Sequence, residues 1–336
     1  MKKTLTAFSA ACALLAASAV WADDKVVMGT NWLAQGGHGG FYQALADGTY
    51  EKYGLDVEIS PGGPQVNNRP MLSAGRLDFL MAGNLLLSFD NVRNGIPTTV
   101  IAALYQKDPQ ALMAHKGQYA DFAALTDAPT ILVSKDGQFS FWEWMVQSNG
   151  FRNEQLRPYG YNLAQFLSDN KMVQQAYGTA EPIYAADQGT EVDVFLLADN
   201  GWNTYAATIE TRQELIDENP ELVQRFVDAT IEGWVNFLYG DNAAAYEAIM
   251  AANPEMTVEK LDKEVAQLQA LEIIDSGDAL DTGIGSMSEE RIKAFHDLAV
   301  SSGILEEGAV DLSKVATSQF VNKGHGLDLK ARLKGN

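Results

Sequence analysis

The sequence contains very little cysteine. Cys12 is the single cysteine in 336 residues, and it lies close to the N-terminus. The rest of the chain therefore offers no thiol nucleophile and no thiolate ligand for zinc or an iron–sulfur cluster. It cannot form an internal disulfide either, so we expect its folded part to be held together by apolar cores.

Basic residues are also scarce. Lys and Arg together number 24 against 44 Asp and Glu, which gives a formal net charge of −20 at pH 7. Binding to nucleic-acid phosphates needs basic surface, and so does binding to anionic lipid. The charge balance therefore argues against a nucleic-acid partner and a membrane-surface role. A hydrophobic content of 46% is typical of a globular protein, and the length suggests about two domains.

The chain lacks the motifs of the common catalytic and metal sites. Its histidines, at 38, 115, 296 and 325, are far apart, so none forms a helical metal pair with another. There is no G-x-x-x-x-G-K-[ST] phosphate loop and no G-x-S-x-G nucleophile elbow. We therefore expect no metal, no cofactor and no enzymatic activity. The glycine run GGHGG at 36–40 precedes a predicted helix, whose N-terminus would suit a polar or anionic ligand atom.

The first 22 residues have the pattern of a secretory signal peptide. Lys2 and Lys3 form a short basic region, 5–20 is uncharged, and small residues precede the expected cut after Ala22. A membrane anchor is the alternative, but the run is short for a hydrocarbon core of about 30 Å. A lipid anchor at Cys12 is a further alternative, disfavoured because the apolar run continues past it. We expect a periplasmic protein.

Export gives the first testable prediction. The mature protein should begin at Asp23 and be released without detergent, because the segment that resembles a membrane-inserting run is removed with the leader. N-terminal sequencing of the protein from a periplasmic extract checks this. A cytosolic protein that retains Met1 would contradict it.

Short apolar runs alternate with helical patterns in the first part of the mature chain. Strands are predicted at 26–28, 55–59, 79–82 and 99–104, and helices at 41–53, 66–73 and 85–93. Such alternation is typical of a largely parallel sheet covered by helices. The pattern then restarts, with strands predicted at 111–114, 130–134 and 192–197 and helices at 141–149 and 163–170.

From Thr211 onwards the chain is predicted to be helical. Thr211 and Glu214 have the spacing of a capping box, and Asn219-Pro220 is typical of a helix start before the periodic apolar residues of 222–238. Further helices are expected to begin at 253–254 and at 288–290. We predict one lobe from 23–110 with 205–336 and a second from 111–204, so the chain would cross between lobes near 105–112 and 200–208.

Aromatic residues gather at predicted strand ends. They are Trp32, Tyr105, Phe141, Trp142, Trp144, Tyr159, Tyr161, Tyr177 and Trp202. In α/β proteins, ligands bind beyond the carboxyl ends of strands, so some of these rings could cover a flat ligand. Packing in the core is the alternative for about two thirds of them. Glu181, in a loop bounded by Gly178 and Pro182, could accept hydrogen bonds from a ligand amine, or be a solvated carboxylate.

Four stretches resemble a known family. They are N-W-x-x-x-x-x-H-x-x-F-Y at 31–42 with G-L-D-V at 54–57, G-R-L-D-F at 75–79, G-T-A-E-P at 178–182 and N-P-E-L-V-Q-R-F at 219–226. These are similar to periplasmic solute-binding proteins of the thiamine-pyrimidine-precursor type, a family related to sulfonate-, taurine- and nitrate-binding proteins of ABC importers. The resemblance implies an α/β, two-lobed class II periplasmic-binding-protein fold with a hinge and a ligand cleft between the lobes.

The resemblance also implies a ligand site and partners. Matching positions give Trp32, His38, Asn84 and Glu181 as ligand-binding residues, and strand-end placement adds Tyr105 and Tyr177. The expected ligand is a heteroaromatic compound like the thiamine pyrimidine precursor; a small anion such as a sulfonate, taurine or nitrate is the alternative. The expected partners are an ABC permease and ATPase complex in the inner membrane, with the binding protein itself a monomer.

An enzymatic branch of the same family offers another reading. The fungal thiamine pyrimidine synthase carries a lysine and a histidine after the aspartate that matches Asp78, together with a cysteine-rich run. Here Ala82 and Leu86 stand at those two positions, and no cysteine follows Cys12. The resemblance therefore implies binding rather than synthase chemistry.

Overall fold

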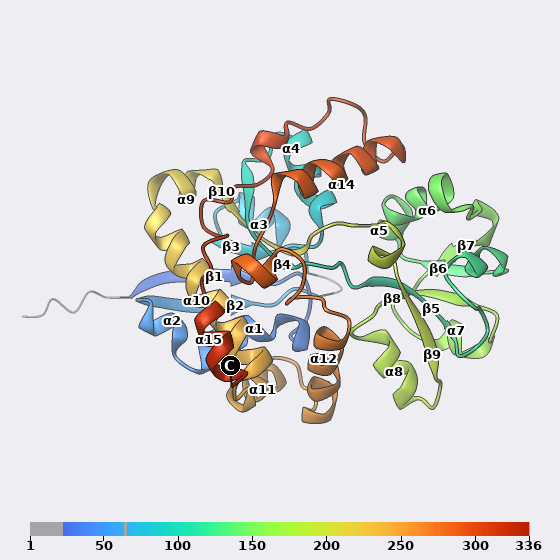
Figure 1. The fold of residues 1–336 in the computed structure, drawn as a ribbon, viewed down its shortest axis with the longest axis horizontal. Coiled ribbons are helices and arrows are strands. Elements are labelled where there is room, and N and C mark those ends of the chain that lie inside the picture. Colours follow the sequence, from blue (N-terminus) through green and yellow to red (C-terminus); the bar gives the residue numbers. More distant parts are fainter. Residues whose placement is uncertain (1–22, 64–65, 336) are drawn as a thin grey trace, which may run out of the picture.

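The computed structural model describes residues 23–63 and 66–335, and it contains two five-stranded sheets (Figure 1). We call the first sheet and its helices lobe 1, and the second sheet and its helices lobe 2. One continuous stretch, 110–200, forms lobe 2, shown in green to yellow-green in Figure 1. Lobe 1 takes in chain from both sides of that stretch. The predicted signal peptide, 1–22, lies outside the described residues.

The sheet of lobe 1 has the strand order β2-β1-β3-β10-β4. The strands are β1 (Asp24–Gly29), β2 (Leu55–Ser60), β3 (Phe79–Met81), β4 (Thr98–Tyr105) and β10 (Ala206–Arg212). β1 is parallel to β2 and β3, as predicted, whereas β10 is antiparallel to β3 and β4. Sequence patterning did not predict β10. Its residues are buried along almost its whole length, so it lacks the alternation that marks a half-exposed strand.

The sheet of lobe 2 has the same kind of order, β7-β6-β8-β5-β9. The strands are β5 (Gln110–His115), β6 (Ile131–Val133), β7 (Leu156–Pro158), β8 (Val173–Tyr177) and β9 (Val192–Leu196). β6 is parallel to β7 and β8, and β5 is antiparallel to β8 and β9. The predictions at 111–114, 130–134 and 192–197 are confirmed as strands, while β7 and β8 were not predicted.

Helices flank both sheets. Lobe 1 carries α1 (Gly39–Ala46), α2 (Thr49–Lys52), α3 (Arg69–Ser73), α4 (Leu85–Arg93), α9 (Gln213–Glu218), α10 (Pro220–Tyr239), α11 (Ala243–Ala252), α12 (Val258–Ala270), α13 (Ala279–Thr282), α14 (Glu289–Ser301) and α15 (Leu327–Leu333). Lobe 2 carries α5 (Lys135–Gln138), α6 (Phe141–Asn149), α7 (Ala164–Ser168) and α8 (Glu181–Asp187). Short 3-10 helices are η1 (Gly36–His38), η2 (Ala123–Asp127), η3 (Asn153–Gln155), η4 (Ala198–Asn200) and η5 (Leu312–Lys314).

Two predicted helix starts are confirmed by their caps. The Asn219 side chain accepts a hydrogen bond from the Leu222 N–H at the start of α10. The Ser288 hydroxyl accepts one from the Arg291 N–H at the start of α14. Both caps satisfy backbone donors that a helix leaves free at its N-terminus.

Other helix predictions were wrong in detail. Thr211 lies within β10 and caps no helix, because its hydroxyl donates to the carbonyl of Asp78, the residue just before β3. The predicted helix at 41–53 is divided into α1 and α2 by Gly48, which has a left-handed φ of 75°. Asn253 ends α11 rather than starting a helix, and α12 begins after the Thr257 cap.

Glycines allow α1 and α10 to pack closely. A Cβ atom at Gly40 would lie 2.2 Å from the Trp234 ring, and one at Gly233 would lie 2.3 Å from the Gly40 carbonyl oxygen. Neither distance is possible between non-bonded atoms, so only glycine fits at either position. Part of the 36–40 glycine run therefore serves helix packing.

Most of the aromatic residues gathered at strand ends belong to the core. Tyr105, Phe141, Trp142, Trp144, Tyr159 and Trp202 are buried. Trp144 of lobe 2 packs on Trp202 of the chain crossing, which packs in turn on Phe295 of α14, with ring centroids 5.4 and 5.0 Å apart. Burial of large rings is strongly favourable, so this column ties the crossing to both lobes. Among the described residues, no helix combines the length and apolar character needed to cross a membrane.

Candidate functional site

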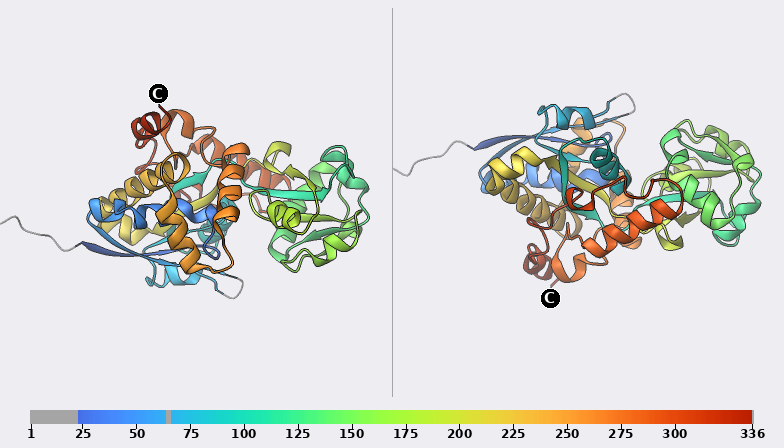
Figure 2. Two further views of the ribbon diagram at one scale, coloured as in Figure 1. Left: turned by 90° about the horizontal axis from the view of Figure 1, so that it is seen from below. Right: turned by 90° about the horizontal axis from the view of Figure 1, so that it is seen from above.

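The two lobes are joined by two crossings and also touch through side chains. The crossings link β4 to β5 and β9 to β10. Both views in Figure 2 show lobe 2 at one end of the molecule, beside lobe 1. The Trp32 and Tyr161 rings meet across the lobes with centroids 6.0 Å apart. On another edge, α12 of lobe 1 lies next to α8 of lobe 2, where Lys263 and Asp187 form an ion pair of 2.9 Å.

Glu181 is the first residue of α8, rather than part of a loop as the sequence suggested. A Pro at the next position is compatible with the first helical turn, and an acidic residue there is favoured by the helix dipole. One carboxylate oxygen accepts a hydrogen bond of 2.8 Å from the Tyr177 N–H, and the other accepts one of 3.3 Å from the Tyr159 hydroxyl. Burial raises the pKa of Glu181, although these hydrogen bonds oppose the rise.

A chain of aromatic rings connects Glu181 to Trp32. Tyr159, which donates to Glu181, lies with its ring centroid 5.2 Å from that of Tyr161. Tyr161 then meets Trp32, which lies after β1 in lobe 1 and is half-buried. Trp32 and Glu181, which the sequence analysis placed in opposite lobes of one site, are thus linked through two tyrosines.

Glu264 of α12 is a second carboxylate at this lobe contact, and sequence reasoning missed it. It accepts a hydrogen bond of 2.6 Å from the Gly36 N–H of lobe 1 and one of 3.2 Å from the Tyr184 hydroxyl of lobe 2. Glu264 shares the buried face of α12 with Leu261 and Val265. The sequence signal that could have identified Glu264 is a carboxylate at an apolar position of a helical pattern. Carboxylates are rarely buried unless other groups hydrogen-bond to them.

Glu264 gives a pH prediction. Burial raises its pKa from 4.5 to about 7, opposed by the Gly36 and Tyr184 hydrogen bonds and by the Lys260 charge, and supported by the Glu181 charge. The folded state therefore holds this proton up to about pH 7, and the unfolded chain releases it near pH 4.5. Between these values stability should fall as pH rises, by up to about 1.4 kcal/mol per pH unit from this group.

The measurement is the free energy of unfolding at pH 5 and pH 7.5 for the parent protein and Glu264→Gln. We expect the variant to gain stability relative to the parent at the higher pH, because it has no charge to bury. Glu259→Gln, an exposed change on the same helix, is the control and should track the parent at both values. A constant difference between Glu264→Gln and the parent would contradict the prediction.

The glycine run does not present a free anion site. The Gly36 N–H points to the Glu264 carboxylate, so a group of the chain itself occupies the position expected for a ligand anion. His38 is buried, and its Nε2 atom lies 3.0 Å from Oδ1 of Asn31. Burial lowers the pKa of His38 to about 4, so the ring is neutral at pH 7.

Asn84, Tyr105 and Tyr177 lie around the first crossing. The Asn84 side chain caps α4 by accepting from the Leu86 N–H, and its amide donates to the buried carboxylate of Asp108 at 3.1 Å. The buried Tyr105 hydroxyl donates to the Gly37 carbonyl at 2.7 Å, which is a contact within lobe 1. Tyr177 ends β8, and burial together with the Asp108 charge raises the pKa of its hydroxyl.

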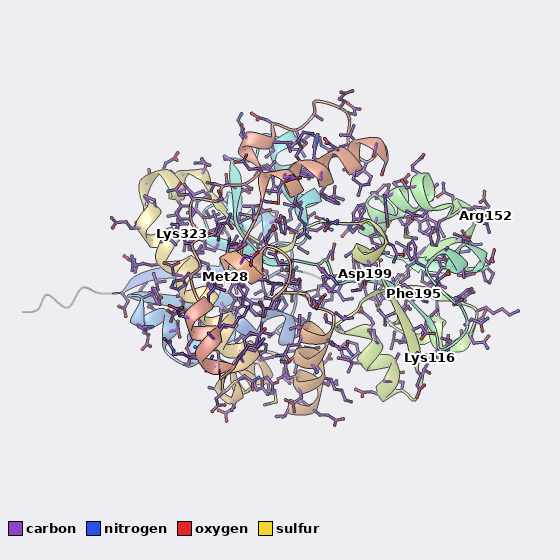
Figure 3. All side chains as sticks on the ribbon, viewed as in Figure 1. Met28, Lys116, Arg152, Phe195, Asp199 and Lys323 are labelled. Atoms are coloured by element: carbon purple, nitrogen blue, oxygen red, sulfur yellow. The ribbon has the colours of Figure 1, made fainter. Side chains whose placement is uncertain are left out.

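Three buried carboxyl groups, those of Asp108, Glu181 and Glu264, lie at the first crossing and at the contact between the lobes. Burial raises the pKa of Asp108, as it does for Glu181 and Glu264. In the part of the chain that the structure describes, none of these three carboxylates forms an ion pair. Figure 3 shows Arg152 at the outer end of lobe 2, away from lobe 1. No group of His, Cys, Asp and Glu within residues 23–63 and 66–335 is arranged to hold a metal ion.

Two surface cavities lie elsewhere, in lobe 1. One of about 570 Å³ is lined by α10 and the C-terminal segment, including Glu232 and His325. The other, of about 810 Å³, lies between the start of β4, α9 and 308–319. The predicted site residues line neither cavity.

The family model described as "NMT1/THI5 like" matches residues 35–244. The riboflavin-binding protein RibY of Chloroflexus aurantiacus is 26% identical over 240 residues, which cover 69% of this chain and 67% of that protein.

Solved structures share the fold. The aliphatic sulphonate binding protein SsuA of Escherichia coli has a TM-score of 0.62 and 14% identity, covering 87% of this chain and 91% of its own. The nitrate-binding protein NrtA of Synechocystis PCC 6803 has a TM-score of 0.60 and 15% identity, covering 92% and 89%. A structure named as the desulfurization enzyme DSZB has a TM-score of 0.57 and 12% identity, covering 88% and 97%.

These likenesses confirm the predicted α/β periplasmic-binding-protein fold with two sheets. The family match covers more than half of the chain and includes η1, α1, both crossings and α10. From this match we conclude that the chain belongs to the NMT1/THI5-like family.

Proposed function

We propose that this chain is the substrate-binding component of an ABC importer, exported to the periplasm as a monomer, which delivers a small solute to a permease and ATPase in the inner membrane. The solute is a flat heteroaromatic compound with hydrogen-bond donors at its edge. Membership of the NMT1/THI5-like family and the similarity to a riboflavin-binding protein support this proposal.

The observation that carries the proposal is the meeting of Trp32 and Glu181 through two tyrosines between the lobes. Trp32 and Tyr161 offer ring faces from opposite lobes. Glu181 and Glu264 offer carboxylate oxygens from opposite lobes. Each carboxyl group has acceptor positions beyond the hydrogen bonds that it accepts here. Ring faces with acceptors at the edge suit an amino-substituted aromatic ring.

The alternative ligand is a small anion such as a sulfonate, taurine or nitrate. The likeness to SsuA and NrtA, at 14% and 15% identity, concerns the fold. An anion near Glu181 and Glu264 would add negative charge beside two carboxyl groups whose burial already disfavours their charged form, and no cation forms an ion pair with either group among the described residues. The electrostatics therefore favour a neutral or cationic ring.

A panel of ligands tests the proposal. Thermal unfolding would be followed with riboflavin, 4-amino-5-hydroxymethyl-2-methylpyrimidine, taurine and nitrate. A ligand at 100 times its Kd stabilises the folded state by about 2.7 kcal/mol, which raises Tm measurably. We expect a shift with at least one of the two aromatic compounds. A shift with taurine or nitrate alone would favour the anion reading.

Catalysis is the second alternative, because the fold also occurs in a structure named as an enzyme. Mass spectrometry of the aromatic ligand after prolonged incubation separates the two functions. A binding protein should return the ligand unchanged, whereas a modified product would identify an enzyme.

Closure of the lobes is a further prediction. A ligand that contacts both lobes stabilises the closed state by its differential affinity for that state. Small-angle scattering should therefore show a smaller radius of gyration, or a narrower spread of conformations, with saturating aromatic ligand than without it. An identical scattering profile in both conditions would count against a hinge between the lobes.

A further inference from the structure

The residue that stands out beyond the predicted site is Tyr161. It lies in the turn between β7 and α7, and 57% of its surface is exposed although it is a large aromatic residue. Its backbone has a φ of 55°, in the left-handed region that non-glycine residues rarely adopt. Such strain is retained when the surrounding structure holds it, and it concentrates at functional positions.

The turn around Tyr161 is held firmly on both sides. Tyr159 is buried, and its N–H donates to the Val133 carbonyl of β6. On the other side Leu163 is buried, and the Asn162 side chain bridges the Gly160 carbonyl and the Ala164 N–H, at 3.1 Å each. The anchored flanks hold the backbone on both sides of Tyr161, whose exposed ring contacts those of Tyr159 and Trp32.

The projecting ring contacts lobe 1. Its centroid lies 6.0 Å from that of Trp32, with 31° between the ring planes. Two rings that enclose a third need centroids about 7 Å apart, because aromatic carbon atoms stack at about 3.5 Å on each face. The pair is therefore about 1 Å too close, and too tilted, for a ligand to fit between the rings, so a ligand bound there would hold the two rings slightly farther apart than in their direct contact.

We infer that Tyr161 is the lobe 2 counterpart of Trp32, so that a flat ligand is held between these two rings and replaces their direct contact. This inference rests on the proposed function and deepens it. It assigns to a strained, exposed residue the task of stacking on the ligand from lobe 2, opposite Trp32 of lobe 1. It also sets ligand selectivity, because only a planar ring can occupy a space bounded by two ring faces.

The test compares Tyr161→Gly with Tyr161→Phe. Glycine removes the ring and also relieves the left-handed backbone, whereas phenylalanine retains the ring. Titrations would use riboflavin and 4-amino-5-hydroxymethyl-2-methylpyrimidine as probes. For a probe that the parent binds, we expect Tyr161→Gly to weaken binding about tenfold or more. Tyr161→Phe should bind within about twofold of the parent.

The control is Glu272→Gly, which relieves a φ of 55° at another exposed residue and should leave the Kd unchanged. Parent-like binding by Tyr161→Gly would overturn the inference while leaving the proposed function intact. If the parent binds neither probe, the proposed function fails, and this inference fails with it.

Discussion

Glu181→Gln is expected to weaken binding of an amino-substituted aromatic ligand about tenfold or more. A hydrogen bond to a charged group contributes roughly 1.5–3 kcal/mol, and each 1.4 kcal/mol corresponds to a factor of ten in Kd. The amide can still accept from the Tyr177 N–H, so α8 should keep its start. Calorimetric titration with 4-amino-5-hydroxymethyl-2-methylpyrimidine and with riboflavin measures the effect.

Trp32→Ala should also weaken binding, but with a different dependence on the ligand from Glu181→Gln. Stacking contributes about 0.5–1.5 kcal/mol beyond the burial of area and depends little on edge substituents. The loss should therefore be similar for both aromatic probes, whereas the loss from Glu181→Gln should follow the donors on the ligand edge. Glu259→Gln, exposed on α12, is the matched control. If neither Trp32→Ala nor Glu181→Gln changes Kd beyond twofold, these residues do not form the ligand site.

Gly233→Ala is expected to lower the free energy of unfolding by about 2 kcal/mol or more. An added Cβ would lie 2.3 Å from the Gly40 carbonyl oxygen and 2.6 Å from the Ala44 Cβ. Backbone atoms cannot move aside by rotating a side chain, so α1 and α10 must separate and lose packing around Trp234. This cost should exceed the gain of up to about 1 kcal/mol that alanine brings to a helix interior.

Denaturant unfolding followed by circular dichroism measures this loss. Gly160→Ala is the control, because a Cβ there meets only the exposed Asn162 amide, at 3.3 Å. It should change stability by a few tenths of a kcal/mol. Parent-like stability of Gly233→Ala would mean that the two helices are not in close contact in solution.

Local patterns in the sequence predicted the helices and strands that are marked by nearby residues, such as a capping residue before an apolar run. Asn219 and Ser288 cap α10 and α14, as their spacing before an apolar run indicated. The parallel strands of lobe 1 follow from alternation with helices. In contrast, β10 is a long-range element: it is buried between β3 and β4, and the side chain of Glu210 is bonded to Ser88 and Asn91. From the sequence alone, a glutamate within a strand predicts a solvent-exposed position, although Glu210 is buried.

In the candidate site too, residues in local motifs could be predicted, whereas residues that depend on long-range contacts could not. Trp32 and Glu181 could be named from motifs, and their positions in the site remain predictions. Glu264 could not be named, because its role depends on α12 returning to lobe 1 and meeting Gly36 across 228 residues of sequence. The glycine run indicated a ligand-binding helix start, while the structure uses Gly39 and Gly40 for packing against α10. Local sequence does not show which partner a glycine makes room for.

The central claim is that this protein binds a flat, donor-bearing aromatic solute between its lobes and returns it unchanged. Calorimetric titration of the mature protein with riboflavin and with 4-amino-5-hydroxymethyl-2-methylpyrimidine tests it most directly. We predict one-to-one binding of at least one of the two, with the intact compound recovered on unfolding. Binding of neither aromatic compound, together with saturable binding of taurine or nitrate, would contradict the account.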